Sequence, residues 1–337
     1  MTSTSTASNT SGEVKGWWRK SCIIQDRLDD KLAVVTGANT GIGLVTAAEL
    51  ARRGCTVIMA CRSQERAQAA KKQILDNYSH SNPKSTTLHV ADECVTKSLS
   101  PVTSEQLVVE QLDLGSLKSV REFAVCITSA YPNIHYLINN AGLALAKYET
   151  TEDGFEKTIG VNHLGPFLLT YLLLPNLKLA APSSRIINVS SLVHYWGSLC
   201  KPDLHIPKAA YDLTRAYRQS KLANVMHARE LSRRLLGTSV TAVSLHPGVV
   251  NTEFFRQHTS FKNRIIHTLL KPVQISPWLG AQTTLYTVLS NNVVSGLYYD
   301  NCSPKRASET AMNDGECKWL WNKSCELLSI PQTADSQ

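Results

Sequence analysis

Short runs of apolar residues recur along the chain and predict buried strands. They stand at 31–35, 55–60, 107–112, 136–139, 185–190, 240–245 and 295–299. Uninterrupted runs of this length are typical of strands that are covered on both faces, as in a parallel sheet. We therefore expect a sheet of about seven strands.

Between the runs, small and apolar residues recur at helical spacing, and Gly54 marks one helix end. The helices predicted in this way cover 42–53, 64–75 and 117–129. Strands that alternate with helices indicate an α/β fold with a doubly wound parallel sheet of the Rossmann type, and with helices on both faces.

The chain is expected to form one domain over 31–330, with a partly disordered extension at 1–30 and a tail at 331–337. Residues 76–105 are rich in Ser, Thr and Asn, and nothing in them is expected to bury a core face. This segment is therefore predicted to be a surface insertion.

The composition is that of a soluble globular protein, with 43% hydrophobic and 18% charged residues. A net charge of +8 suits anionic ligands or membrane surfaces, or is simply a basic solvated surface. No nucleic-acid partner is expected, because there is no run of five like charges. The nine cysteines lack CxxC or metal-ligand spacing, which predicts reduced intracellular thiols and no metal site.

No apolar segment reaches the roughly 18 residues of a membrane span. The best candidate runs from Phe167 to Leu174 and is predicted to be a core helix that ends at Pro175–Asn176. The N-terminus lacks the apolar region of a secretory signal. We expect an intracellular protein, cytoplasmic or peripherally attached to membranes. The pair Trp17–Trp18 is expected to pack on the domain, and contact with a bilayer interface is the alternative.

A glycine-rich turn follows the first strand, with Gly37, Gly41 and Gly43 in the sequence TGANTGIG. Glycines allow a tight turn and close approach of a pyrophosphate, and the next helix directs its N-terminal N–H groups at that anion. The spacing departs from the general dinucleotide fingerprint, and a structural turn is the alternative.

The second strand is informative about the cofactor. NAD sites place an acidic residue about 20 residues beyond the turn, where it bonds the ribose 2′-hydroxyl. No acid lies between Leu50 and Gln64, and Arg62 ends the strand. A guanidinium suits the 2′-phosphate of NADP, so NADP(H) is the expected cofactor. A solvated surface charge is the alternative for Arg62.

Tyr217 and Lys221 are four residues apart, which places both side chains on one helix face. An ammonium group there is predicted to lower the pKa of the phenol, which is about 10 when free. Such a phenol could exchange a proton with an alcohol oxygen near neutral pH.

Taken together, these motifs resemble those of the short-chain dehydrogenase/reductase family, over about 31–330. The motifs in order are TGANTGIG (36–43), DLGSL (113–117), NNAG (139–142), VNHLG (161–165), NVSS (188–191), YRQSK (217–221) and HPG (246–248). Within the family the chain is similar to the retinol dehydrogenase branch. The stretches that carry this likeness are ACRSQERA (60–67), TEDGFE (151–156), SKLANV (220–225) and WNKSCELL (321–328).

The resemblance implies catalytic roles. Tyr217 would be the general acid/base, Lys221 would lower its pKa and bond the nicotinamide ribose, and Ser191 would hold the substrate oxygen. Ser190 is the competing choice for that serine. Asn162 would support Lys221 through a water-linked proton path, and Pro166, a departure from the branch, could bend its helix.

The resemblance also implies contacts to the cofactor, with Asp113 beside the adenine and Asn140 beside the nicotinamide ribose. The full set expected to bind it is Gly37, Asn39, Thr40, Gly41, Ile42, Gly43, Arg62, Asp113, Asn140, Tyr217 and Lys221. Asp113 could instead cap a helix, and Asn140 and Asn162 could be buried structural amides.

The segment at about 249–277 follows HPG and is expected to form a lid over the substrate. Its apolar residues Phe261, Ile265, Ile266, Leu269 and Leu270 fall on one helical face. This pattern suits a pocket wall, contact with anionic lipid, or plain core. His194, Tyr195 and Trp196 are candidates to shape the pocket mouth or to pack.

The expected activity is NADP-dependent interconversion of a small lipophilic alcohol and its aldehyde or ketone, of the retinol and retinal type. A steroid or small-carbonyl reductase on the same scaffold is one alternative. A catalytically weak, cofactor-binding regulator is another.

Overall fold

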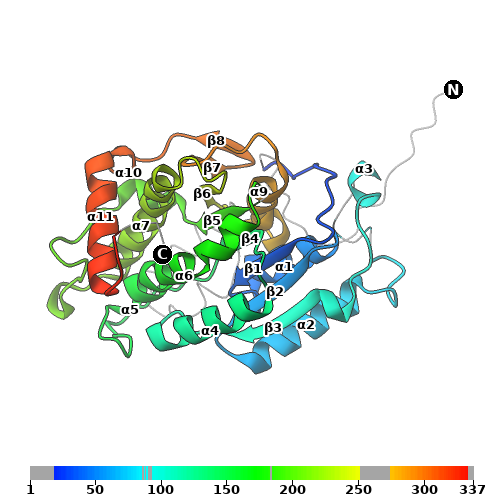
Figure 1. Ribbon diagram of the computed structural model, residues 1–337, viewed down its shortest axis with the longest axis horizontal. Helices are drawn as coiled ribbons and strands as arrows, with labels where there is room; N and C mark the ends of the chain where they lie inside the picture. The colour runs from blue at the N-terminus through cyan, green and yellow to red at the C-terminus, as the bar shows by residue number, and fades with distance from the viewer. Residues whose placement is uncertain are drawn as a thin grey trace.

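The computed structural model describes residues 19–85, 87, 89, 93–182, 184–250 and 274–332. Within them the strands form one eight-stranded sheet in the order β3-β2-β1-β4-β5-β6-β7-β8 (Figure 1). The strands are β1 (Leu32–Thr36), β2 (Thr56–Cys61), β3 (Leu107–Gln111), β4 (Tyr136–Asn139), β5 (Arg185–Val189), β6 (Thr241–His246), β7 (Tyr298–Asp300) and β8 (Ser303–Lys305). The first seven pair in parallel, whereas β8 pairs antiparallel with β7. The doubly wound sheet is confirmed, and β8 was not predicted.

Helices cover both faces of the sheet. They are α1 (Gly41–Ala51), α2 (Gln64–Tyr78), α3 (Glu93–Thr96), α4 (Leu117–Ala130), α5 (Lys157–Ile159), α6 (Gly165–Leu179), α7 (Leu213–Arg234), α9 (Pro277–Leu289), α10 (Glu309–Met312) and α11 (Asp314–Leu327). Shorter turns are η1 (Ser104–Gln106), η2 (Gly160–Leu164), η3 (Leu192–Trp196) and η4 (Lys208–Ala210).

Alternation along the strands divides the core into two layers. In β1, Ala33 and Val35 face the layer that contains α1, α2 and α9, whereas Leu32 and Val34 face the layer of α4, α6 and α11. Successive strand side chains point to opposite faces, so an uninterrupted apolar strand supplies both layers.

The strand order reverses between β1 and β4, which are neighbours although β2 and β3 lie between them in sequence. In doubly wound sheets a crevice opens at such a point, beyond the carboxyl ends of the strands. The glycine turn follows β1 and the NNAG motif ends β4, so both meet at this crevice.

The predicted end of the core helix at Pro175–Asn176 is wrong, because α6 continues to Leu179. Pro175 is exposed, so its ring lies on the solvent side of the helix. Asn176 is buried, and its side-chain amide donates to the carbonyls of Tyr131 and Pro132, which holds this end of the helix.

The expectation that nothing in 76–105 could bury a core face is also wrong. Tyr78, which ends α2, is buried, and so are Val95, Leu99 and Val102. The Val102 N–H donates to the Tyr78 carbonyl at 2.7 Å. Isolated apolar residues in a polar stretch carry no periodic pattern, yet tertiary packing uses them.

The described part of the N-terminal extension lies against the domain. Leu28 is buried, and its N–H donates to the Arg53 carbonyl at 2.7 Å. The Cys22 N–H donates to Gln282 of α9 at 2.9 Å. Trp17 and Trp18 lie outside the described residues.

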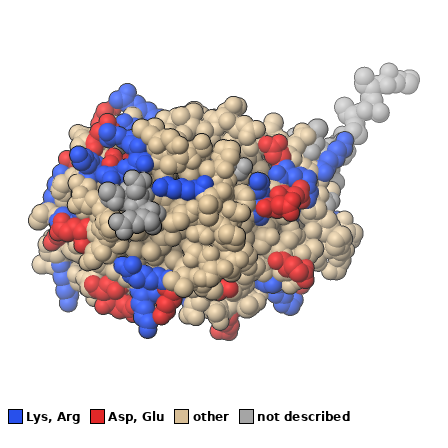
Figure 2. Space-filling view, in the orientation of Figure 1, with Lys and Arg blue, Asp and Glu red and all other residues tan. Residues whose placement is uncertain are grey.

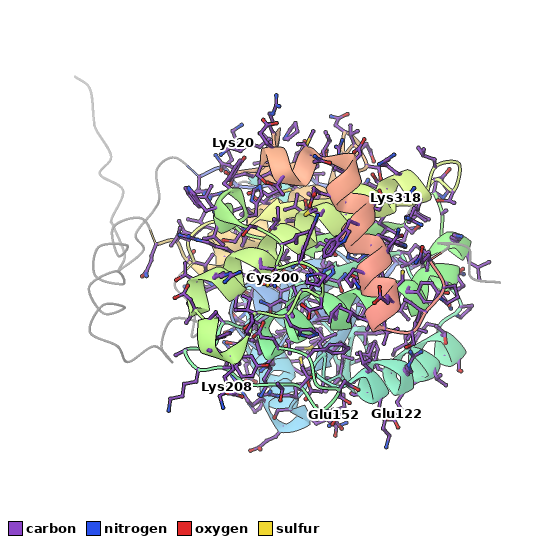
Figure 3. The ribbon with its side chains drawn as sticks, turned by 90° about the vertical axis from the view of Figure 1, so that its left-hand side faces the viewer. Lys20, Glu122, Glu152, Cys200, Lys208 and Lys318 are labelled. Atoms are coloured by element: carbon purple, nitrogen blue, oxygen red, sulfur yellow. The ribbon has the colours of Figure 1, made fainter. Side chains whose placement is uncertain are left out.

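The C-terminal helix α11 packs across α7, as the view in Figure 3 shows. Trp321 of α11 is 3% exposed and its ring centroid lies 4.7 Å from that of Phe167 in α6. The Arg234 guanidinium of α7 lies 4.4 Å from the same indole. This helix therefore belongs to the core.

We expect Trp321→Ala to lower the free energy of unfolding by about 3 kcal/mol or more, because it leaves a cavity and removes buried surface. The matched control is Trp319→Ala on the same helix, where the indole is only partly buried. Urea unfolding of both variants measures the difference. Equal losses would contradict the assignment of α11 to the core.

Candidate active site

The three glycines of the turn are required by its geometry. Gly37 and Gly41 have positive φ angles of +67° and +56°, which side chains rarely adopt. A Cβ at Gly43 would lie 2.3 Å from the Gly37 carbonyl oxygen. The backbone of Gly43 therefore approaches that of Gly37 more closely than a residue with a side chain would allow.

The N-terminus of α1, whose first N–H groups have no partner within the helix, lies at this turn. The Thr40 side chain makes no capping hydrogen bond, and the first turn of α1 has no acidic residue. Ile42 lies toward α9, because a Cβ at Gly280 would be 3.2 Å from its Cγ1. Unpaired N–H groups with no carboxylate nearby favour an anionic ligand.

Asn140 braces the turn from β4. Its side-chain amide donates to the Thr36 carbonyl at 2.8 Å, and its backbone N–H donates to the Thr36 hydroxyl at 3.0 Å. Asn140 therefore has at least in part the structural role that was the alternative to a contact with the nicotinamide ribose. This contact holds the ends of β1 and β4 together.

A cleft of about 200 Å³ opens beside the turn. Of the predicted cofactor residues, Gly37, Asn39, Arg62 and Asp113 line it. Sequence reasoning missed the other lining residues, which are Ala60, Leu112, Leu114, Ala141, Gly142, Leu143 and Val161. Most of them stand just after a strand end, which was the available signal.

Asp113 does not cap a helix. Ser116 caps α4 with its hydroxyl, and the Asp113 carboxylate accepts the Gly115 N–H at 2.8 Å. Arg62 is exposed and lines the cleft, and in the described part of the chain no carboxylate pairs with it. The cleft therefore carries a cation at the end of β2.

Tyr217 and Lys221 meet on α7 as their spacing predicts. The Lys221 ammonium nitrogen lies 5.6 Å from the centroid of the Tyr217 ring. It is buried and donates to the Val189 carbonyl at 3.1 Å, at the end of β5. The helix face that carries both residues is thus held at the carboxyl edge of the sheet.

The predicted lowering of the Tyr217 pKa is wrong in direction. Burial raises the pKa of the phenol above its ordinary value and outweighs the hydrogen bond from Ser191, which lowers it. Burial also lowers the pKa of Lys221 to about 8. At neutral pH the phenol is therefore protonated and the amine still mostly charged.

The two candidate serines have different partners. The Ser190 hydroxyl donates to the Lys221 carbonyl at 2.6 Å and is buried. The Ser191 side chain hydrogen-bonds Tyr217 and accepts the Val193 N–H at 3.4 Å. Ser191 is therefore the hydroxyl that faces the phenol, and Ser190 anchors α7.

Asn162 lies on the π-helical turn η2, immediately before the helix that contains Pro166. Its amide donates to the Leu143 carbonyl at 2.8 Å and to the Ser220 hydroxyl at 3.0 Å. A Cβ on Gly142 would lie 3.3 Å from the Lys221 nitrogen and 3.4 Å from the Asn162 oxygen. Both residues therefore border Gly142.

The residues expected to shape the pocket mouth differ in placement. The His194 ring accepts the Ser308 N–H at 3.2 Å, and the Tyr195 hydroxyl donates to the Arg306 carbonyl, so both tie η3 to the C-terminal segment. Trp196 is 61% exposed. The predicted lid residues at 251–273, including the amphipathic stretch from Phe261 to Leu270, lie outside the described residues.

Among the described residues, no group of three His, Cys, Asp or Glu side chains could hold a metal ion. None of the helices described is both long and apolar enough to cross a membrane. On the face seen in Figure 2, basic and acidic side chains are interspersed and form no continuous basic surface.

Comparison with known proteins agrees with this arrangement. The short chain dehydrogenase family model matches residues 31–100 and 84–263. Bos taurus retinol dehydrogenase 12 is 41% identical over 311 residues, which cover 92% of this chain and 90% of that protein. Homo sapiens retinol dehydrogenase 11 is 42% identical over 312 residues, or 92% and 89% of the two chains.

Among solved structures, a putative uncharacterized protein from Mycobacterium paratuberculosis is 33% identical, with a TM-score of 0.68 over 90% of this chain and 96% of that one. A Pseudomonas aeruginosa RhlG/NADP complex shares the fold at 20% identity, with a TM-score of 0.59 over 86% and 98% of the two chains. The chain therefore belongs to the short-chain dehydrogenase family of oxidoreductases. Within that family it falls in the retinol dehydrogenase branch.

The two serines are expected to respond differently to substitution. Ser190→Ala should lower the free energy of unfolding by about 1 kcal/mol, because a buried hydrogen bond to α7 is lost. Ser191→Ala should change it by less than about 0.5 kcal/mol. Urea unfolding tests the pair, and an equal loss in Ser191→Ala would contradict the assignment.

Proposed function

We propose that the protein is an NADP(H)-dependent oxidoreductase that interconverts a lipophilic alcohol and its aldehyde, with a retinoid as the favoured substrate class. The observation that supports the proposal is the grouping of Ser191, Tyr217 and Lys221: Ser191 hydrogen-bonds Tyr217, and the Lys221 ammonium lies 5.6 Å from the Tyr217 ring and beside Gly142 of the cleft. The names of the relatives, retinol dehydrogenases 11 and 12, support the substrate class.

The cleft fits a dinucleotide on three grounds. The turn lets backbone approach a pyrophosphate, the N-terminus of α1 offers unpaired N–H groups, and Asp113 and Arg62 stand at the ends of β3 and β2. When bound, a nicotinamide dinucleotide supplies or accepts the hydride. Gly37, Asn39, Thr40, Gly41, Ile42 and Gly43 would hold its phosphates.

Arg62 supports NADP over NAD. The guanidinium stands at the end of β2, lines the cleft, and has no carboxylate partner in the described part of the chain. A free guanidinium can bond a 2′-phosphate in a bidentate manner, whereas it offers nothing comparable to a 2′-hydroxyl.

In the reducing direction, the hydroxyls of Tyr217 and Ser191 donate hydrogen bonds to the substrate oxygen and stabilise the charge that develops there. Tyr217 then donates its proton to that oxygen. Its raised pKa suits this role, because the phenol is protonated when the substrate arrives. In the oxidising direction the substrate alcohol gives its proton to the Tyr217 oxygen.

Lys221 stabilises the phenolate that remains on Tyr217. Its pKa of about 8 keeps the ammonium charged near neutral pH, 5.6 Å from the centre of the ring. Asn162 borders the same glycine as Lys221 and bonds Ser220, the residue before Lys221. We propose that Asn162 supports a water-linked path for proton transfer to and from the Lys221 side of the site.

We further propose that the protein works inside the cell, in the cytoplasm or at a membrane surface where lipophilic substrates collect. The high pKa values of buried thiols such as Cys61, about 11 because of burial, fit reduced and unreactive cysteines.

Tyr217→Phe should reduce turnover of retinal with NADPH by roughly a hundredfold or more, since the proton donor is lost. NADPH binding should stay within about threefold, because the phenol is not needed to hold the phosphates. The control is Tyr211→Phe, which loses only a bond to the Leu145 carbonyl and a contact with Thr158.

The measurements are steady-state kinetics over a panel of retinal, medium-chain aldehydes and steroids, with fluorescence titration of NADPH. Full turnover in Tyr217→Phe would exclude the phenol as the acid. No turnover of any panel member by the natural protein, with NADPH bound, would favour a cofactor-binding regulator.

Arg62→Glu should weaken NADPH binding by roughly tenfold to a hundredfold, because a charge-assisted hydrogen bond is replaced by repulsion. NADH binding should change little. Lys118→Glu makes the same change of charge on the exposed surface of α4 and serves as the control. Dissociation constants for both cofactors test this, and equal effects on NADPH and NADH would rule out a contact with the 2′-phosphate.

A further inference from the structure

A charged contact links the N-terminal segment to the far side of the sheet. The Arg19 guanidinium donates to the Asp300 carboxylate of β7 at 2.7 Å, and each side chain is only 12% exposed. A pair this shielded is less screened by solvent than a surface ion pair. The two residues are 281 positions apart in sequence.

Asp300 in turn stands beside a buried histidine. It is the cross-strand neighbour of His246, which ends β6 in the HPG motif. The His246 ring nitrogen Nδ1 accepts the Leu192 N–H at 3.2 Å. Leu192 directly follows Ser191, so the imidazole fixes the backbone that carries the Ser191 hydroxyl.

This hydrogen bond needs a neutral imidazole. A ring nitrogen accepts a hydrogen bond only while it carries no proton, so an imidazolium would repel the Leu192 N–H. Burial is the main cause that lowers the pKa of His246 to about 4, and Asp300 alone acts in the opposite direction. The remaining charged or titratable groups, Arg19, His194 and Lys305, all lower it.

Two cations pair with Asp300, but they differ in shielding. Lys305 lies 3.1 Å from the second carboxylate oxygen and is 50% exposed, so solvent weakens its charge. Arg19 is well shielded and also lies against the HPG turn. A Cβ at Gly248 would be 3.0 Å from the Arg19 guanidinium, and the φ of +98° there favours glycine.

We propose that Arg19 is a positioning residue for Ser191. Its guanidinium compensates the Asp300 carboxylate, so that His246 accepts the Leu192 N–H and holds Ser191 toward Tyr217. The N-terminal segment thereby becomes part of the apparatus that aligns the substrate oxygen. This inference rests on the proposed oxidoreductase function, in which Ser191 contacts that oxygen.

The test is a double-mutant cycle with the full chain. Arg19→Met leaves Asp300 to act on His246 and should lower kcat for aldehyde reduction by roughly tenfold to a hundredfold, because the Ser191 hydroxyl is displaced. Arg19→Met combined with Asp300→Asn removes both charges and should restore kcat to within about threefold of the natural protein. Arg19→Lys should retain activity, since it keeps the charge.

Lys20→Met is the matched control. This neighbouring lysine, labelled in Figure 3, is exposed, and among the described residues its ammonium bonds only the Ser303 hydroxyl. It should leave kcat unchanged. NADPH affinity, measured by fluorescence titration, should also be unchanged in every variant of the cycle.

The outcomes separate positioning from simple tethering. A tether is broken equally in Arg19→Met and in the double variant, so an equal loss of kcat in both would overturn the proposal. Full activity of Arg19→Met would overturn it as well. Where Arg19→Met alone does not fold, an active double variant supports the proposal and an inactive, folded one contradicts it. Absence of turnover in the natural protein would instead overturn the proposed function.

Discussion

A buried ammonium group, that of Lys221, is the constraint on which the site depends. Burying a charge is costly unless it is well hydrogen-bonded, and Lys221 donates to the Val189 carbonyl at the end of β5. The hydroxyl of Ser190, which follows Val189, donates a hydrogen bond to the Lys221 carbonyl. These two reciprocal bonds lock α7 onto β5 and so fix where Tyr217 stands relative to Ser191.

Much of the fold could be predicted because its signals are local. Most of the seven parallel strands contain short runs of apolar residues, and the glycine turn follows the first of them directly. β8 was missed because Ser303, Pro304 and Lys305 carry no apolar pattern, and it is a strand only through its pairing with β7. The helix α6 continues through Pro175, whose ring lies on the exposed side of the helix. The sequence alone does not show which side of the helix is exposed.

The site divides in the same way. The spacing of Tyr217 and Lys221 is a helical property and was readable, whereas the pKa of the phenol depends on how tertiary packing encloses it, and the prediction had the wrong sign. Ser190 and Ser191 have the same side chain, so the sequence cannot distinguish their roles. Only the fold shows that Ser190 bonds the Lys221 carbonyl and that Ser191 bonds Tyr217. The contact between Arg19 and Asp300 joins residues from opposite ends of the chain, so no local sequence pattern could predict it.

The central claim is that this crevice aligns a carbonyl for hydride transfer while Tyr217 supplies the proton. The most direct test follows the hydride itself. NADPH deuterated at both positions of the hydride-donating nicotinamide carbon is mixed with the protein and retinal, and the product is examined by mass spectrometry. The account predicts retinol with a single deuterium on the carbinol carbon, and retinol without deuterium would contradict it.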